Sequence, residues 1–114
     1  MAQRPLVMTQ PTYFDATATV FYTQAVNSVG QVLRATVFNN DVVARQITLF
    51  RVPVAGSPGA NNTIMAGQGG RLLSKQSAVI DVLAGATLDP GDTVQGLADA
   101  GNMVVFTMSG YITT

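Results

Sequence analysis

The chain has 114 residues, of which 47% are apolar and only 11% are charged, with six acidic and six basic side chains. That length fits one domain with a single core. The sparse and balanced charge argues against a field that would attract nucleic acid or an anionic membrane surface. Thr, Val, Ala and Gly are abundant and glutamate is absent, a composition that favours strands and turns over helices.

The N-terminal segment, residues 1–17, contains two prolines and no regular alternation of apolar and polar residues. We expect an extended arm outside the core, ordered by contact with a neighbouring molecule. A β-sandwich domain is then expected over residues 18–114. No apolar core of signal-peptide length and no run of ~20 apolar residues is found, so we expect a soluble protein made without an export signal.

Turn-forming residues divide the rest of the chain at short intervals, as in a sandwich or barrel. Segments rich in β-branched and aromatic residues lie between the turns. The predicted strands are 18–23, 29–39, 45–54, 76–83, 92–98 and 102–112, with room for a seventh near 71–73. Residues 58–70 are predicted to be a loop. The expected fold is an all-β, single-domain antiparallel β-sandwich, jelly-roll or Ig-like, with about six to eight strands.

Apolar residues occur on both faces of several predicted strands. In the last strand, alternation places Val105 and Tyr111 on one face and Val104, Phe106 and Met108 on the other. A lone two-layer sandwich leaves the outer face of each sheet in water, so apolar residues there indicate burial against another subunit. The pattern therefore predicts a homo-oligomer or a larger assembly.

The same alternation in residues 29–38 places Leu33 on one face with Ala35 and Val37, and Val32 on the other.

Histidine and cysteine are both absent. Their absence excludes Ser-His-Asp and Cys-His constellations, disulfides and the ordinary zinc, copper or iron sites. An enzyme is therefore the least expected class, and we assign no catalytic, cofactor-binding or metal-binding residue. An enzymatic function would require a cleft in which the side chains of Asp81, Asp89 or Asp99 converge.

Two motifs have a chemical and a structural interpretation. Asp89 and Asp92 are a conceivable carboxylate pair or calcium site, but Asp-Pro-Gly-Asp is also the chemistry of a tight turn, which we favour. The Gly-rich piece AGQGGR, residues 66–71, is a conceivable phosphate cradle with Arg71 as the cation. It lacks the Gly-Lys-Ser/Thr ending of a P-loop, and a flexible loop is the favoured interpretation.

The order of the segments is the strongest clue to function. The chain carries Val-Phe-Tyr-Thr at 20–23, VLRATVFNNDVVARQITLFRVPVAGSP at 32–58, Ala-Gly-Ala-Thr at 84–87, LDPGDTVQGLA at 88–98 and VVFTMSGYI at 104–112. This order of a Tyr-Thr strand, a strand ending in Val-Pro, a Gly-Asp-Thr turn and a closing Ser-Gly resembles a recurrent small all-β virion protein of tailed bacteriophages and prophages. The resemblance covers about residues 18–112, and residues 61–70 do not align with it.

The resemblance implies a non-enzymatic virion structural protein. The favoured role is a capsid decoration, or cement, protein that forms a trimer or dimer and binds the major capsid protein, or other virion proteins, across subunit junctions. It would be made in the bacterial host cytoplasm and lie on the capsid surface. The resemblance implies no cofactor, nucleic acid, membrane or small-molecule substrate.

Two other functions stay open. One is a tail, neck or baseplate accessory protein of the virion that contacts a receptor. The other is a non-viral sandwich module that binds carbohydrate or protein.

The N-terminal segment and the last strand supply the residues expected at an interface with other subunits. They are Pro5, Leu6, Val7, Tyr13, Phe14, Val104, Phe106 and Met108.

Overall fold

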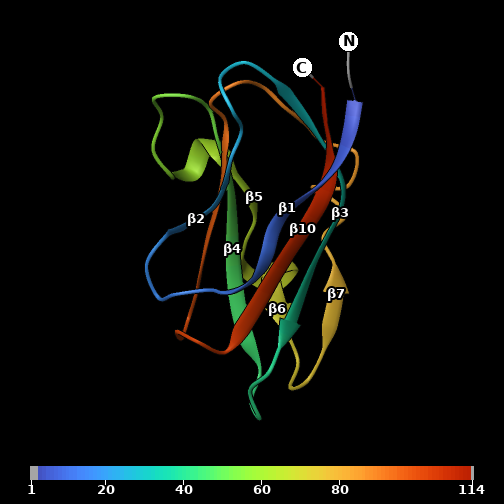
Figure 1. Cartoon of the computed structure of the whole chain (residues 1–114). Coiled ribbons are helices and arrows are strands. Elements are labelled where there is room, and N and C mark those ends of the chain that lie inside the picture. Colours follow the sequence, from blue (N-terminus) through green and yellow to red (C-terminus); the bar gives the residue numbers. More distant parts are fainter. Residues whose placement is uncertain (1–2, 114) are drawn as a thin grey trace.

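A computed structural model describes residues 3–113 and shows two antiparallel sheets packed face to face (Figure 1). The strands are β1 (Gln3–Tyr13), β2 (Thr19–Thr23), β3 (Val29–Asn39), β4 (Arg45–Val52), β5 (Thr63–Met65), β6 (Arg71–Leu72), β7 (Ser77–Val79), β8 (Thr87–Leu88), β9 (Thr93–Ala98) and β10 (Val104–Thr113). Two short 3₁₀ turns, η1 (Ala60–Asn62) and η2 (Gly67–Gly70), are the only helical elements in this range. The predicted all-β antiparallel sandwich is confirmed, with ten strands in place of six to eight.

The first sheet has the order β1-β10-β3-β7, and β8 pairs with β3 beside β7. The second sheet has the order β2-β9-β4-β5, and β6 also pairs with β4. On one side of the sandwich β1 lies next to β2, where the Thr9 hydroxyl donates a 3.1 Å hydrogen bond to the carbonyl of Phe21. On the opposite side the edges are the short strands β7 and β5. The centre of the first sheet is therefore formed by β10 and β3, and the centre of the second sheet by β9 and β4.

The N-terminal segment is part of the first sheet. β1 pairs with β10 from Gln3 opposite Thr113 to Tyr13 opposite Val105. This finding corrects the prediction of an arm outside the core, the first two residues of which lie outside the described range. β1 is an edge strand, where N–H groups on the free side need no partner, and two register shifts interrupt its pairing with β10. Prolines are tolerated in that setting, which is why proline content misled the prediction.

A β-bulge changes the facing of residues in β3. Arg34 pairs with Ser109, whereas the next pair joins Val32 to Gly110, so Leu33 is the extra residue. Leu33 is consequently exposed while Val32 is fully buried. The prediction that Leu33 shares a face with Ala35 is wrong because simple alternation ignores bulges.

The segment 58–70, predicted to be a loop, is more ordered than expected. It contains η1, β5 and η2, and β5 extends the second sheet by pairing with β4. The segment 76–83 forms a strand only over Ser77–Val79 and then enters a turn beside β3, to which Ile80 and Gly85 still donate backbone hydrogen bonds.

Three phenylalanines form the centre of the core. Phe14 follows β1, Phe21 lies on β2 and Phe106 lies on β10. The rings of Phe14 and Phe21 meet edge to face with centroids 4.8 Å apart, and those of Phe21 and Phe106 stack at 4.7 Å. Each side chain is at most 8% exposed. Aromatic burial of this kind supplies a large share of the hydrophobic free energy that holds the sheets together.

Buried amide side chains fix the connections at the ends of the sandwich. The Asn39 amide nitrogen lies 2.9 Å from the carbonyl oxygen of Val43 and 3.2 Å from that of Leu72, which joins the β3–β4 connection to β6. Gln24 is also fully buried and accepts a 2.9 Å hydrogen bond from the Tyr22 hydroxyl. Burial raises the pKa of Tyr22 above its usual range.

Candidate assembly surface

The outward side of the first sheet carries a group of exposed apolar side chains, which we name the bare face. Its members come from four strands of the sheet, and each points away from the core. They are Val7, Tyr13, Leu33, Phe38 and Val79, together with the half-buried Val105 and Tyr111. Exposed apolar residues that are contiguous across a sheet mark an interaction surface more often than scattered ones do.

Strand pairing places these residues side by side. Tyr13 lies opposite Val105 on β10, and Val105 lies opposite Phe38 on β3, so the three form one row across the sheet. Directly opposite residues on one face of an antiparallel pair are within contact distance. In the next row, the hydroxyls of Thr36 and Thr107 are hydrogen-bonded at 2.6 Å. The bare face is thus a continuous surface of aromatic, aliphatic and threonine side chains.

Charge is almost absent from this surface. Among the outward positions of the paired strands in the first sheet, within residues 3–113, Arg34 is the only charged residue. A surface with so little charge has little desolvation penalty when a partner covers it. The arrangement therefore suits binding to another protein surface rather than to a polyanion.

The outward side of the second sheet is different, because the chain covers part of it. Phe50 and Val52 point away from the core, yet they are only 8% and 1% exposed. The turn after β4 folds back over Val52, since a Cβ added at Gly56 would lie 3.3 Å from a methyl group of Val52. The protein therefore shields the outward apolar residues of β4 in the second sheet, whereas Val20 at that sheet's edge and the bare face of the first sheet stay uncovered.

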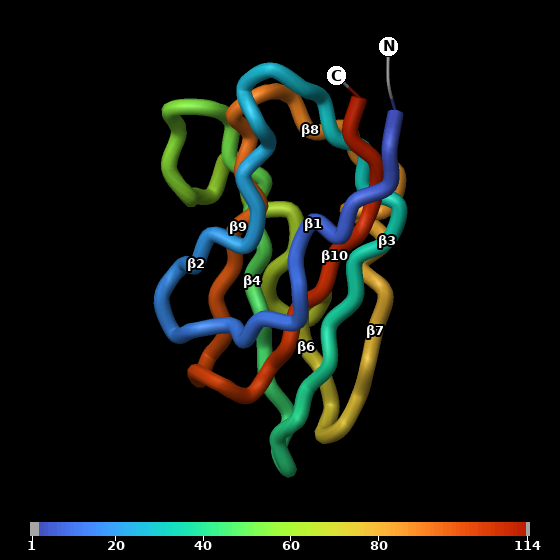
Figure 2. Tube along the Cα trace, viewed as in Figure 1, coloured from blue at the N-terminus to red at the C-terminus, as the bar shows by residue number. Residues whose placement is uncertain are grey.

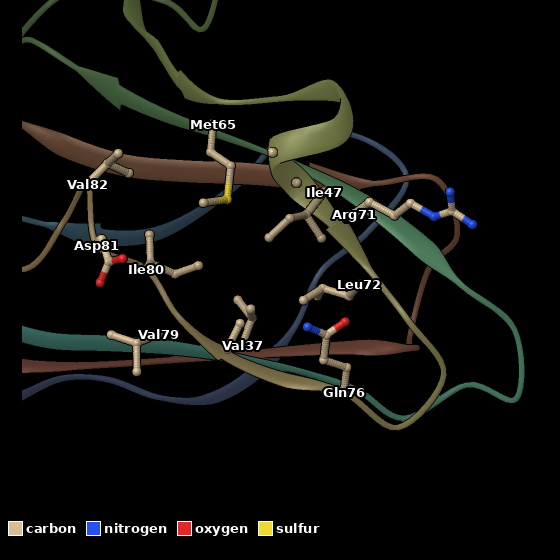
Figure 3. Close-up of a pocket in the computed structure, with 13 residues that line it drawn as sticks. Val37, Ile47, Met65, Arg71, Leu72, Gln76, Val79, Ile80, Asp81 and Val82 are labelled. Atoms are coloured by element: carbon tan, nitrogen blue, oxygen red, sulfur yellow. The ribbon is translucent and has the colours of Figure 1, made fainter.

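A cleft of about 390 Å³ opens between the two sheets on the side of β7 (Figure 3). Val37, Ile47 and Ile80 line its interior, and all three are almost fully buried. Arg71 and Asp81 stand at opposite ends of the view, so no pair of charged groups converges in it. The cleft is an apolar gap between sheet edges and offers no arrangement suited to acid–base chemistry.

The predicted turn at residues 89–92 is present in the structure. The Asp92 carboxylate accepts a 3.0 Å hydrogen bond from the backbone N–H of Asp89 and lies 3.4 Å from a guanidinium nitrogen of Arg51. Gly91 has a φ of 86°, a conformation that favours glycine. The Asp92 carboxylate and the Asp89 backbone N–H therefore stabilise the turn. No group of three or more potential metal-ligating side chains occurs within the range that the structure describes.

The Gly-rich piece at 66–71 forms η2 and packs on β4. A side chain at Gly70 would collide with the carbonyl oxygen of Ile47, so this glycine permits close approach of two backbone segments. Arg71 begins β6 and is exposed. The phosphate-cradle interpretation gains no supporting feature here.

The structure separates the residues predicted for an interface into two groups. Phe14, Val104, Phe106 and Met108 are at most 1% exposed and belong to the core, so they do not reach a surface on which an interface could form. Phe14 was selected as part of the predicted N-terminal arm, and the other three were selected because β10 is apolar on both faces and alternation alone does not tell the inner face from the outer one.

The other four predicted interface residues lie on β1. Pro5, Val7 and Tyr13 are exposed, while Leu6 is partly buried against the core. Their role in an interface stays a prediction. Sequence reasoning missed Leu33, Phe38 and Val79, which pairing with β10 and β3 brings next to them; only knowledge of the bulge and of the strand order identifies these residues.

The sequence matches no protein-family model and no curated protein. Two solved structures, of the Gx and Gt strains of infectious bursal disease virus, are similar in fold with TM-scores of 0.49 and 0.44 and sequence identities of 11% and 10%. Each alignment covers 97% of this chain and 32% of the other, so the chain spans about a third of the length of the proteins it matches. Likeness at this level does not identify a family. Among residues 3–113, no helix is long and apolar enough to cross a membrane.

Proposed function

We propose that the protein is a non-enzymatic virion structural protein of a tailed bacteriophage, a capsid decoration protein that binds the major capsid protein across subunit junctions. The observation that carries the proposal is the bare face, a nearly uncharged apolar surface that the chain itself leaves uncovered. The major capsid protein is proposed as the partner because residues 18–112 resemble small phage virion proteins. The capsid surface is the proposed location, and the host cytoplasm the proposed place of synthesis.

The mechanism is burial of apolar area. Strands about 4.8 Å apart and about 30 Å long give the first sheet a face of roughly 500 Å². A stable pairwise interface buries about 800 Å² on each partner. The bare face alone therefore supports a modest contact. Many such contacts repeated over a shell add up, which is how a decoration protein would strengthen a capsid.

Residues from three strands form the proposed contact. Pro5, Val7 and Tyr13 of β1 lie beside Leu33 and Phe38 of β3, with β10 between the two strands. A capsid protein that docks here would present an apolar surface with few charges, because Arg34 is the one charge it would meet.

The direct test is immunogold labelling of intact particles of the virus that encodes the chain, viewed by electron microscopy. We expect label distributed over the head. Label confined to the tail, neck or baseplate would overturn the capsid role and favour the tail accessory alternative. Particles without label, in a preparation whose infected cells contain the protein, would overturn the virion role and leave the non-viral binding module.

A further inference from the structure

The two free edges of the first sheet are built differently. β1 carries Pro5 and Pro11 and two register shifts, which are features that block pairing with another strand. β7, with the sequence Ser-Ala-Val, has no proline, no charge and no register shift. In Figures 1 and 2, β7 lies at the outer margin of the molecule. One edge of the sheet is therefore protected and the other is open.

The backbone of β7 has groups free to pair. Ala78 is directly opposite Val37, and the flanking hydrogen bonds join Asn39 N–H to the Gln76 carbonyl and Ile80 N–H to the Ala35 carbonyl. The Gln76 carbonyl, the backbone groups of Ala78 and the Ile80 N–H thus point toward β3. Because these groups alternate along a strand, those of Ser77 and Val79 point away from the sheet. Both residues are exposed.

Opposite charges stand at the two ends of β7. Lys75 precedes the strand and Asp81 follows it, and both are exposed. The Lys75 ammonium donates hydrogen bonds of 2.9 and 3.0 Å to the carbonyl and side chain of Asn40 but reaches no carboxylate. The ion pairs within residues 3–113 involve Arg45 and Arg51 and leave both Lys75 and Asp81 without a partner of opposite charge.

We propose that β7 pairs antiparallel with β7 of a second copy of this chain, about a twofold axis at Ala78. This register places Ser77 opposite Val79 of the partner subunit, so that the outward backbone groups face one another and form about four hydrogen bonds. Lys75 and Asp81 lie in the turns that flank β7, so the pairing brings the turn of Lys75 near the turn of Asp81 of the partner subunit, twice by symmetry. The charge pattern therefore selects a second copy as the occupant of the edge.

The pairing joins the first sheets of two copies into one continuous sheet. The two bare faces then lie on the same side of that sheet, which doubles the apolar surface available to a larger partner. Ala78 and Val79 also line the cleft between the sheets, so a second β7 covers part of its entrance. The edge contact is short, and we expect reversible association that strengthens with protein concentration.

Sedimentation velocity on the purified full-length chain, from about 10 µM to about 1 mM, tests the proposal. The wild type should shift from monomer to dimer over this range. Lys75→Asp makes both ends of β7 acidic and Asp81→Lys makes both ends basic. Each variant alone should weaken dimerisation at least about tenfold. An equimolar mixture of the two variants should recover it, because the pair is complementary.

The mixing experiment separates a specific contact from a folding defect, since two misfolded variants would not restore each other. Ser77→Pro is a second probe: it removes an outward N–H at the start of the strand, where proline is tolerated, and should also abolish the dimer. Arg4→Asp on the protected edge is the matched control and should leave dimerisation unchanged. A wild type that stays monomeric at the highest concentration, or charge variants whose mixture shows no recovery, would overturn the proposal.

The dimer is a property of the isolated chain and the virion role is a property of its binding to particles. A monomeric protein that labels phage heads would refute the β7 contact alone, and a dimer that labels no particle would refute the virion role alone.

Discussion

The two sheets of this sandwich differ in how far the chain covers the apolar residues on their outer surfaces. In the second sheet, Val52 points outward and is 1% exposed because the following turn folds over it. In the first sheet, Phe38 points outward and is 37% exposed, and Leu33, farther along the same strand, is 60% exposed. The chain covers the outward apolar residues of β4 with its own turn but leaves a group of them from four strands uncovered on the first sheet, which indicates that the outer surface of the first sheet has another use.

The largest expected effect comes from placing a charge on each of these two outer surfaces. Val52→Asp should destabilise the protein by about 3 kcal/mol or more, because it leaves an unpaired charge in a buried site. Phe38→Asp, whose carboxylate stays in water, should cost less than about 1 kcal/mol. Urea unfolding measures both values. Equal losses in the two variants would contradict the distinction between a covered and a bare surface.

A second prediction concerns the contact between β10 and β3 under the bare face. A Cβ at Gly110 would collide with the carbonyl oxygen of Gln31, so Gly110→Ala should force the strands apart and cost about 1–3 kcal/mol. Gly69→Ala is the control, because an added Cβ there has no atom within 4 Å. Its unfolding free energy should change by less than about 0.5 kcal/mol. A wild-type stability for Gly110→Ala would show that the strands are not this close.

A third, smaller effect is expected where the two sheets are linked at one end. Asp92 accepts from the Asp89 N–H and pairs with Arg51 of β4, so Asp92→Ala should lower the free energy of unfolding by about 1–2 kcal/mol. Asp89→Ala removes an exposed carboxylate that makes no hydrogen bond within residues 3–113, and should be close to neutral. Thermal unfolding of the two variants side by side provides the measurement. A larger loss in Asp89→Ala would reverse the assigned roles.

The smallest effect is a pH dependence at the connection between β3 and β4, which joins the two sheets. The hydrogen bond from Arg45 holds the pKa of Asp41 below its usual 3.8. A carboxyl with a lowered folded-state pKa stabilises the fold at neutral pH and loses that contribution as pH falls below about 4. The melting temperature of Asp41→Asn should therefore lie slightly below that of the wild type at pH 7 and converge with it toward about pH 2. A difference that is constant with pH would contradict this account.

The central strands were predictable because their residues agree with the period of a strand. β3, β4, β9 and β10 lie in segments rich in β-branched and aromatic residues between turn signals. β1 was not predicted, since Pro5 and Pro11 argue against a strand unless it lies at an edge, and edge position depends on the whole topology. The three-residue β5 has too few residues for a periodic signal.

The candidate surface was harder to predict than the fold. The two-faced character of β10 was visible in the sequence, but which face is inward depends on the packing of Phe14 and Phe21 against Phe106. The bulge at Leu33 exchanges the facing of its neighbours and has no reliable sequence signal. The role of Asp89 and Asp92 in a turn was predictable, because Pro-Gly between them encodes the turn locally.

Cosedimentation with viral heads that lack the protein tests the central claim most directly. The wild type should sediment with the heads, and Phe38→Asp, on the bare face, should remain in the supernatant. Val20→Asp changes an exposed valine on the outward side of the second sheet and should sediment like the wild type. Binding by Phe38→Asp equal to that of the wild type, or loss of binding in Val20→Asp alone, would contradict the claim that the bare face is the assembly surface.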